Sequence, residues 1–274
     1  MNINEFDYHL PQELIAQKPA DRRDGSRLMA VHRDSGKVEH RHFYDILEYL
    51  NSGDCLVLNN SKVLPARLFG EKEQTGAKVE FLLIKRIEGD VWETMVRPGK
   101  RLKPGDTVAF SPSFKAEIVD YGQDGTRLAR FRYEGIFMER LEELGKMPLP
   151  PYITHQLKDK NRYQTVYAKH DGSAAAPTAG LHFTKELLKE IEDMGVTIAH
   201  VTLHVGLGTF RPVKADTIED HHMHSEFYVV EDEEAKKIND TKKNGGRVIC
   251  VGTTSCRTLE SAVNEDGTLE AKSG

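Results

Sequence analysis

The stretch Val-Glu-Phe-Leu-Leu-Ile-Lys-Arg-Ile-Glu-Gly-Asp-Val-Trp-Glu-Thr-Met-Val, residues 79–96, decides the fold of the middle of the chain. Its β-branched and aromatic residues predict two strands around the turn Glu88-Gly89-Asp90. Further strands are predicted at 107–110, 114–121 and 127–133, with no helix between them. Short strands at this spacing predict a small all-β barrel over residues 66–149.

Helical and strand patterns alternate on both sides of this segment. Phe43, Ile46, Leu47 and Leu50 follow helical spacing and predict a helix. Later elements are predicted as a strand at 55–58, a helix from 185 to 194, strands at 196–205 and 226–230, a helix at 231–244, a strand at 247–251 and a helix at 256–263. The sequence therefore predicts an α/β domain of residues 1–65 and 150–274, into which the β domain is inserted.

Composition excludes several classes of protein. Of the 274 residues, 38% are hydrophobic and 30% are charged, which excludes a disordered chain, a coiled coil and a collagen. No apolar run approaches the ~20 residues that span a bilayer, so we expect no membrane segment. The N-terminus lacks the features of a secretory signal. Three cysteines without CxxC spacing indicate a reducing cytoplasm.

Charge is distributed unevenly along a chain whose net charge is -5. Residues 61–104 contain 10 Lys or Arg and 6 Asp or Glu. Residues 216–240 contain 2 Lys or Arg and 9 Asp or Glu. The basic segment favours contact with an anion, although ordinary surface charge explains the same counts.

Two loops are rich in small residues that let a ligand approach the backbone. The loop at 174–183 contains Thr178, Gly180 and His182, and the loop at 204–212 contains His204, Gly206, Gly208 and Thr209. The first leads into a helix N-terminus, which suits an anion. The alternatives are a packed loop with a buried histidine, and a hairpin turn that needs glycine.

Histidines gather near residue 224. On a strand, His222, His224 and Glu226 would share one face. Together with His200 and His204 they suit proton transfer or a zinc or iron site. A metal-dependent hydrolase or oxygenase is therefore an alternative function.

The segment 251–258 could hold a carboxylate through Thr253, Thr254, Ser255 and Arg257 at a helix start. Capping of that helix by Thr254 or Ser255 is the alternative.

Arginine and tyrosine suit phosphate contact and base stacking. Arg97, Lys100 and Arg101 lie in the β domain, and Arg162 and Tyr163 follow the proline-rich boundary at 147–152. The alternative is that these are solvated loops. A non-catalytic RNA-binding module built on the β domain is a third possible function.

Several long motifs occur in the order of one family. They include Phe6-Asp7-Tyr8-His9-Leu10-Pro11, then Leu58-Asn59-Asn60-Ser61-Lys62-Val63-Leu64-Pro65-Ala66-Arg67-Leu68, and the segments 174–183, 204–212, 223–226 and 252–259. The chain resembles the S-adenosylmethionine:tRNA ribosyltransferase-isomerases of queuosine biosynthesis along essentially its whole length. Family members continue past the position of Gly274 with a segment containing Asn-Phe-His-Leu-Pro, which we expect to complete the catalytic domain.

The resemblance implies a mixed α/β, barrel-like catalytic domain and a specific reaction. The ribosyl part of S-adenosylmethionine is transferred to 7-aminomethyl-7-deazaguanine in the wobble position of tRNA and isomerised. The product is epoxyqueuosine, and adenine and methionine are released. S-adenosylmethionine is a co-substrate, no metal is expected, and a cytoplasmic monomer is favoured.

The reaction assigns expected roles to the candidate residues. We expect proton transfer from His182, His204, His224 and Glu226. The S-adenosylmethionine site is expected to contain Thr178, Gly180, Gly206, Gly208, Thr209, Thr253, Thr254, Ser255 and Arg257. Contacts with tRNA are expected from Arg97, Lys100, Arg101, Arg162, Tyr163, Asn59 and Asn60.

Overall fold

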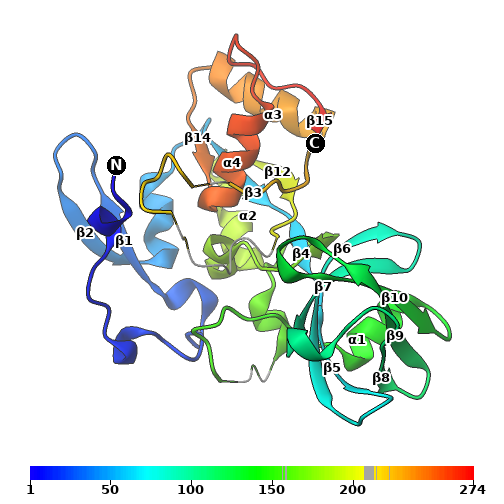
Figure 1. Ribbon diagram of the computed structural model, residues 1–274. Helices are drawn as coiled ribbons and strands as arrows, with labels where there is room; N and C mark the ends of the chain where they lie inside the picture. The colour runs from blue at the N-terminus through cyan, green and yellow to red at the C-terminus, as the bar shows by residue number, and fades with distance from the viewer. Residues whose placement is uncertain (156, 158, 207–212, 214, 222) are drawn as a thin grey trace. The chain divides into compact units, whose positions relative to one another are not determined.

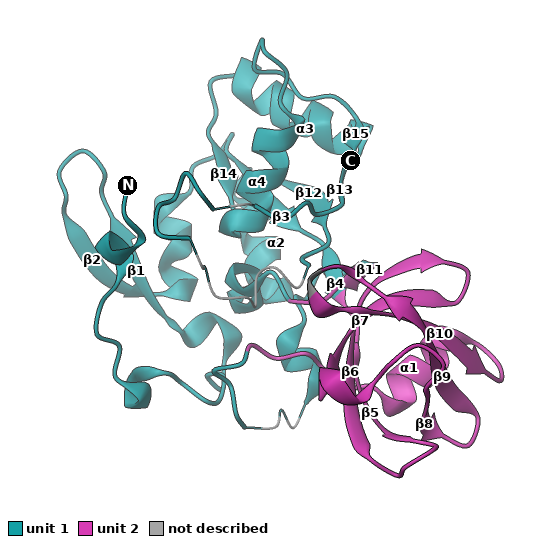
Figure 2. Cartoon of the chain, viewed as in Figure 1, with its two compact units in different colours: residues 1–62, 151–170, 176–274 teal, residues 63–150, 171–175 magenta. Residues whose placement is uncertain are grey.

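The computed structural model describes residues 1–155, 157, 159–206, 213, 215–221 and 223–274. The chain divides into two compact units, which Figure 2 shows in different colours. Unit 1 comprises residues 1–62, 151–170 and 176–274, and unit 2 comprises residues 63–150 and 171–175.

Unit 2 is built on a closed antiparallel barrel of six strands (Figure 1). The strands are β5 (Arg67–Lys72), β6 (Lys78–Glu88), β7 (Val91–Arg97), β8 (Thr107–Ser111), β9 (Phe114–Tyr121) and β10 (Arg127–Tyr133). Their order around the barrel is β10-β7-β6-β5-β8-β9. The predicted small β barrel is therefore confirmed, with β5 as an additional strand that the sequence pattern did not reveal.

The barrel interior is filled by side chains. Phe81, Phe114 and Ile118 are fully buried, as alternation along their strands requires. Helix α1 (Phe137–Leu144) adds Phe137, whose ring stacks on Trp92 with centroids 5.2 Å apart. A packed interior of this kind leaves the outer surface as the place for ligand contact.

Unit 1 contains a five-stranded sheet in the order β14-β3-β12-β13-β15. Its strands are β3 (Cys55–Asn59), β12 (Thr197–Leu203), β13 (Tyr228–Val230), β14 (Val248–Cys250) and β15 (Lys272–Ser273). Strand β3 runs parallel to β12 and β14, whereas β13 is antiparallel to β12. All five residues of β3 are buried, as expected for a central strand covered on both faces.

Helices cover both faces of this sheet. On one face, Leu56 and Leu58 pack in a cluster with Leu187 and Ile191 of α2 (Lys185–Asp193). On the other, Cys55 and Val57 lie in a cluster with residues of α3 (Asp232–Lys243) and α4 (Gly252–Ala262). The mixed α/β fold is confirmed. In the part of the chain that the structure describes, the sheet has β14 and β15 as its two edges, so a barrel-like closure of this unit stays a prediction.

Two element boundaries differ from the prediction. Helix α4 begins at Gly252, four residues earlier than expected, because the hydroxyl-rich segment forms its first turn. Strand β13 begins at Tyr228 and residues 223–227 lie outside it, so the expected shared strand face of His224 and Glu226 is wrong.

The remaining elements are short. They are η1 (Ile3–Phe6), η2 (Gln12–Leu14), η3 (Arg23–Gly25), β1 (Arg27–Val31), β2 (Val38–His42), η4 (Phe43–Tyr49), β4 (Ser61–Val63), η5 (Gly99–Arg101), η6 (Gln123–Gly125), η7 (Lys160–Tyr163), β11 (His170–Ser173) and η8 (Thr178–His182). The helix predicted from residue 43 is the 3₁₀ helix η4, since the Leu50 N–H bonds to the Leu47 carbonyl, three residues back.

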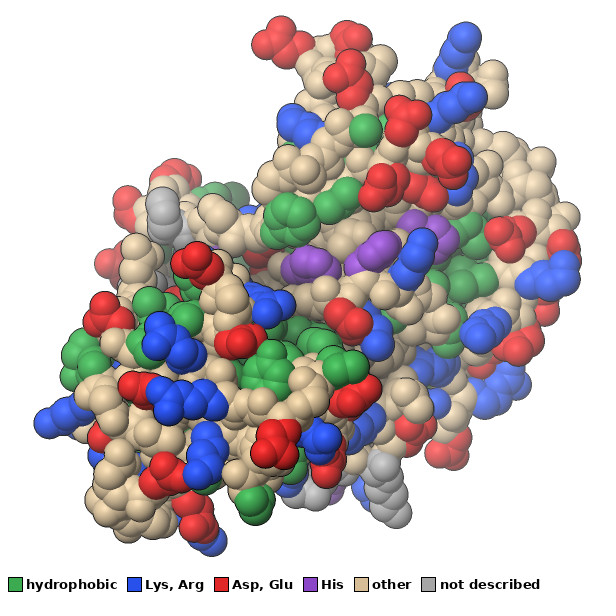
Figure 3. All heavy atoms as spheres, turned by 90° about the vertical axis from the view of Figure 1, so that its right-hand side faces the viewer, with side chains coloured by type: hydrophobic (Ala, Val, Ile, Leu, Met, Phe, Trp, Pro, Cys, Tyr) green, Lys and Arg blue, Asp and Glu red, His purple; other side chains and the backbone are tan. Residues whose placement is uncertain are grey.

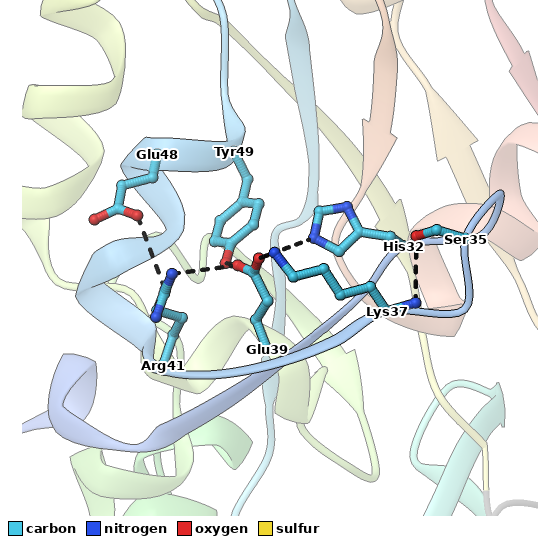
Figure 4. Close-up of polar contacts among 7 residues, drawn as sticks. All are labelled: His32, Ser35, Lys37, Glu39, Arg41, Glu48 and Tyr49. Atoms are coloured by element: carbon cyan, nitrogen blue, oxygen red, sulfur yellow. Dashed lines mark hydrogen bonds and ion pairs between the residues drawn. The ribbon is translucent and has the colours of Figure 1, made fainter.

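The β1–β2 hairpin and η4 share a polar cluster centred on Glu39 (Figure 4). Its carboxylate pairs with Lys37 and accepts a 2.8 Å hydrogen bond from the Tyr49 hydroxyl. The Lys37 and Tyr49 contacts lower the pKa of Glu39 to about 2. Glu39 therefore stays ionised and links the hairpin to η4.

Candidate functional site

The candidate site lies at the carboxyl ends of the parallel strands in the unit 1 sheet. Strands β3, β12 and β14 end on this same side of the sheet, which is where α/β proteins bind ligands. Asn59 is the last residue of β3 and Asn60-Ser61 comes directly after it, His204-Val205-Gly206 follows β12, and Gly252-Thr253-Thr254 follows β14. The structure therefore brings three of the predicted segments together.

Asn59 joins the ends of β3 and β12. Its side-chain amide donates to the Leu203 carbonyl at 3.0 Å, and its side-chain oxygen accepts from the backbone N–H groups of Leu203 (3.0 Å) and Ser61 (3.1 Å). The residue is 1% exposed. Both ends of the carboxamide are thus used inside the protein, which gives Asn59 a structural role at the site.

His204 is held from two sides. Its Nδ1 lies 2.8 Å from the Ser61 hydroxyl, and its ring stacks on Phe227 with an interplanar angle of 19°. Ser61 is fully buried and has its own backbone N–H bonded to Asn59. Ser61 therefore orients the imidazole, a role that sequence reasoning missed although the residue follows a buried strand.

Glu226 and Arg257 connect the loop after β12 to α4. The Glu226 carboxylate accepts a 2.8 Å hydrogen bond from the Gly206 N–H and pairs with the Arg257 guanidinium. The guanidinium also donates to the His224 carbonyl. The Arg257 charge is balanced within the protein, while the His224 side chain is exposed.

The loop predicted to hold a ligand forms η8, which packs against neighbouring segments. A Cβ placed on Gly180 would lie 2.0 Å from the Tyr167 hydroxyl, so only glycine fits there. Ala179 also lies close to the start of α4, because a Cβ on Gly252 would be 3.2 Å from the Ala179 Cβ. Thr178 is exposed, and the His182 ring packs on Phe43 with centroids 5.1 Å apart.

Four buried hydroxyls near these segments have no hydrogen-bond partner among the described residues. They belong to Tyr163, Thr165, Tyr167 and Thr254. Thr165 and Tyr167 flank Gly180, and burial raises the pKa of Tyr167. A buried hydroxyl without a partner costs roughly 1–3 kcal/mol, so these groups suit a polar ligand that would satisfy them.

The first turn of α4 offers fewer free groups than predicted. The Ser255 hydroxyl is buried and donates to the Val251 carbonyl at 3.0 Å, whereas Thr253 is exposed. The alternative of capping by Thr254 or Ser255 is wrong, because Val251 is the N-cap residue and provides no side-chain cap.

A pocket of about 380 Å³ adjoins Asn60. It is lined by Asn60, Tyr167, Lys169, His170, His200, Thr202, Val229, Glu231 and Glu234. Burial lowers the pKa of His200, whose backbone N–H donates to Glu234 at 2.7 Å. On the face drawn in Figure 3, histidine side chains gather close to acidic side chains. Except for Asn60 and His200, sequence reasoning missed these residues as site candidates, because they come from separate segments.

Arg162 and Tyr163 are not solvated loop residues. Arg162 donates to the backbone carbonyls of Ala20 and Asp21, and Tyr163 is buried, which raises its pKa to about 12. Arg23 makes similar bonds to the carbonyls of Leu181 (3.0 Å) and Asn161 (2.6 Å). These arginines fasten the N-terminal segment to η7 and η8.

The other predicted basic residues lie in unit 2. Arg97, Lys100 and Arg101 are exposed at the end of β7 and in η5. Among the described residues, their side chains make no ion pair or hydrogen bond.

Part of the predicted site falls outside the described residues. Gly208 and Thr209 belong to that part, as does His222 of the proposed metal cluster. In the described ranges, no three histidine, cysteine or acidic side chains form a group that could hold a metal ion, so the metal-enzyme alternative receives no support. No helix of these ranges is long and apolar enough to cross a membrane.

Comparison with known proteins reveals the relationships of the chain. Residues 3–274 match the family model described as queuosine biosynthesis protein. An S-adenosylmethionine:tRNA ribosyltransferase-isomerase of Lachnoclostridium phytofermentans is 63% identical, over 100% of this chain and 79% of its own length. Its counterpart in Clostridioides difficile is 60% identical, with 100% and 81% covered.

A solved structure is also similar. It is the crystal structure of an S-adenosylmethionine tRNA ribosyltransferase from Thermotoga maritima, with 39% identity, a TM-score of 0.44, and coverage of 94% of this chain and 72% of that one. The match to the family model and the identities with the two relatives extend over essentially the whole chain. The chain therefore belongs to the queuosine biosynthesis protein family, as its motifs predict, and is a transferase-isomerase.

Proposed function

We propose that this protein transfers the ribosyl part of S-adenosylmethionine to 7-aminomethyl-7-deazaguanine in the wobble position of tRNA and isomerises it. The product is epoxyqueuosine, and adenine and methionine leave. The observation that carries the proposal is the match over the whole chain to relatives that bear this enzyme name.

The proposed site for S-adenosylmethionine lies at the carboxyl ends of the parallel strands in unit 1. The unpartnered hydroxyls of Tyr167, Thr165 and Thr254 provide hydrogen bonds for its ribose and methionine groups. The proposed approach to this site contains Thr178, Gly206 and Thr253, and we assign Gly208 and Thr209 to it from their motif; Gly180 and Ser255 are buried and support it through packing. Arg257 contributes by holding Glu226 in place.

His204 is the proposed base. The sulfonium of S-adenosylmethionine acidifies the adjacent 5′ carbon, so a positioned imidazole can remove that proton. The 2.8 Å contact with Ser61 keeps the ring in one orientation. His182, His224 and Glu226 are proposed for the later proton transfers, including protonation of departing adenine. None of these steps requires a metal.

The proposal also covers the domains and the binding of tRNA. Unit 1 is the proposed catalytic domain, with the barrel-like arrangement that the sequence predicts, and unit 2 is the inserted domain. Arg97, Lys100 and Arg101 contact phosphates, and Asn60, Arg162 and Tyr163 support the region that receives the tRNA base. We propose that the enzyme acts in the cytoplasm as a monomer.

The test is incubation of the protein with S-adenosylmethionine and tRNA carrying the aminomethyl base, followed by chromatography of small molecules. We expect adenine and methionine to be released in equal amounts, and only when both substrates are present. A His204→Ala variant should release adenine about 10²- to 10⁴-fold more slowly, which is the usual contribution of a general base.

His40→Ala is the matched control, because His40 is exposed on β2, which is not part of the five-stranded sheet that carries the site. This variant should keep the wild-type rate. Release of adenine without tRNA, or full activity of His204→Ala, would contradict the proposed reaction or the proposed base, respectively.

A further inference from the structure

We propose that the outer surface of β5, β6 and β7 in unit 2 binds an unpaired nucleotide of the tRNA, with its base stacked on Phe69. This inference rests on the proposed function for the identity of the RNA, and on the geometry of unit 2 for the place. It assigns a contact surface beyond the basic residues found from the sequence.

The surface is a groove of about 700 Å³. Across the three strands, Phe69 is paired in register with Glu80, and Glu80 with Arg97. These residues therefore form one row on the outside of the barrel, and Pro98 and Lys78 also line the groove. An aromatic ring in a row with a guanidinium places a stacking surface beside a phosphate contact.

Phe69 has no packing role inside the barrel. The Phe69 side chain is 50% exposed. The side chain of the preceding residue, Leu68, points to the opposite face of the strand and is fully buried in the barrel. The interior already contains Phe81 and Phe114. A large aromatic side chain that faces solvent in the middle of a groove is typical of a stacking platform for bases.

Lys146 lies over one face of this ring. Its backbone exchanges two hydrogen bonds with Arg67 of β5, at 3.1 and 2.8 Å, and its ammonium lies over the Phe69 ring, 5.1 Å from the centroid. The cation covers this face of the ring, so a nucleotide base would stack on the opposite face.

The charge of the groove favours RNA over an apolar protein segment. The charged residues that line the groove are Lys78, Arg97, Glu71 and Glu80, and two further cations contact its lining, Arg67 at Glu80 and Lys146 at Phe69. Arg67 neutralises Glu80 at 3.1 Å, whereas Arg97 has no ion-pair partner among the described residues. A polyanion with exposed π-faces complements this combination.

The experiment measures the affinity of the enzyme for tRNA carrying 7-aminomethyl-7-deazaguanine by fluorescence anisotropy at several salt concentrations. Phe69→Ala should weaken binding about tenfold without changing its salt dependence, since stacking carries no charge. Phe69→Trp should restore it. Arg97→Ala should reduce the slope of log K against log salt by about 0.7–0.9, as expected for one lost phosphate contact.

Matched controls lie on the barrel away from the groove. Tyr121 is 54% exposed on β9, which lies three strands from β6 in the closed order, and Arg130 is exposed on β10, where it pairs with Val91 at the end of β7 opposite to Arg97. Tyr121→Ala and Arg130→Ala should bind tRNA like the wild type. Wild-type affinity of Phe69→Ala, or an equal loss in Tyr121→Ala, would overturn the inference.

The steady-state rates separate this inference from the proposed function. Phe69→Ala should raise KM for tRNA and leave KM for S-adenosylmethionine unchanged. Absence of adenine release from the wild type would refute the function, whereas normal release with an unchanged KM for tRNA in Phe69→Ala would refute only the groove.

Discussion

Replacement of Ser61 by alanine tests whether the structure orients a catalytic histidine. The substitution removes a buried hydroxyl that lies 2.8 Å from His204 Nδ1, and it changes the volume of the side chain very little. A hydrogen bond of this kind stabilises the orientation of the side chain that it holds by about 1 kcal/mol. If the bond is maintained in the transition state, its loss lowers kcat about five- to tenfold.

The assay is steady-state release of adenine, measured over a range of S-adenosylmethionine and tRNA concentrations. The effect of Ser61→Ala should appear in kcat, with both KM values close to those of the wild type, because Ser61 is buried below the site. A Ser61→Thr variant keeps the hydroxyl and should recover part of the rate.

Ser173→Ala is the matched control for stability. Ser173 is 1% exposed and donates a 2.7 Å hydrogen bond to the Ala175 carbonyl, but it lies in unit 2. Both variants should lose about 1 kcal/mol of unfolding free energy, and only Ser61→Ala should lose rate. Wild-type kcat in Ser61→Ala, or an equal loss in Ser173→Ala, would refute the orienting role of Ser61.

Two further predictions concern stability. The Arg247 guanidinium holds the pKa of Asp54 below its ordinary value, so the pair stabilises the fold above about pH 4 and this contribution is lost as pH falls through the lowered pKa. Asp54→Asn should therefore cost about 1–2 kcal/mol at pH 7 in urea unfolding, and a difference from wild type that persists at pH 2 would argue against this ion pair. Gly180→Ala should cost about 1–3 kcal/mol and weaken S-adenosylmethionine binding in calorimetry, because its Cβ would collide with the Tyr167 hydroxyl. The control Gly99→Ala, whose Cβ would meet only an Arg127 nitrogen at 3.9 Å, should have little effect, and equal losses in both variants would contradict the steric explanation.

Strands with strong local patterns were predictable. The apolar residues of β6 and β7 and the turn at Gly89, whose φ is +52°, indicated a hairpin, and the barrel is confirmed. Strand β5 was missed because Arg67–Lys72 contains charged residues and Gly70, which weaken the pattern of a strand. Its pairing with β6 and β8 overrides that weak propensity.

Helix starts depend on context that a single segment does not contain. The segment after β14 contains Gly252 and hydroxyl residues, which are typical of turns, yet it forms the first turn of α4. Packing of this turn against Ala179 favours the helix. Likewise, a strand was predicted at 226–230, but in the described part of the chain β13 begins at Tyr228 and pairs with β12 through Tyr228 and Val229.

The sequence by itself determined the family, the barrel and the alternation of helices and strands, because motifs and hydrophobic periodicity are local properties of the chain. It also identified His204 as a candidate. Only the tertiary structure decided that Ser61 orients this histidine across a separation of 143 residues. The parallel register of β3 and β12 brings the two strand ends together, and that register results from packing on both faces of the sheet rather than from either segment alone.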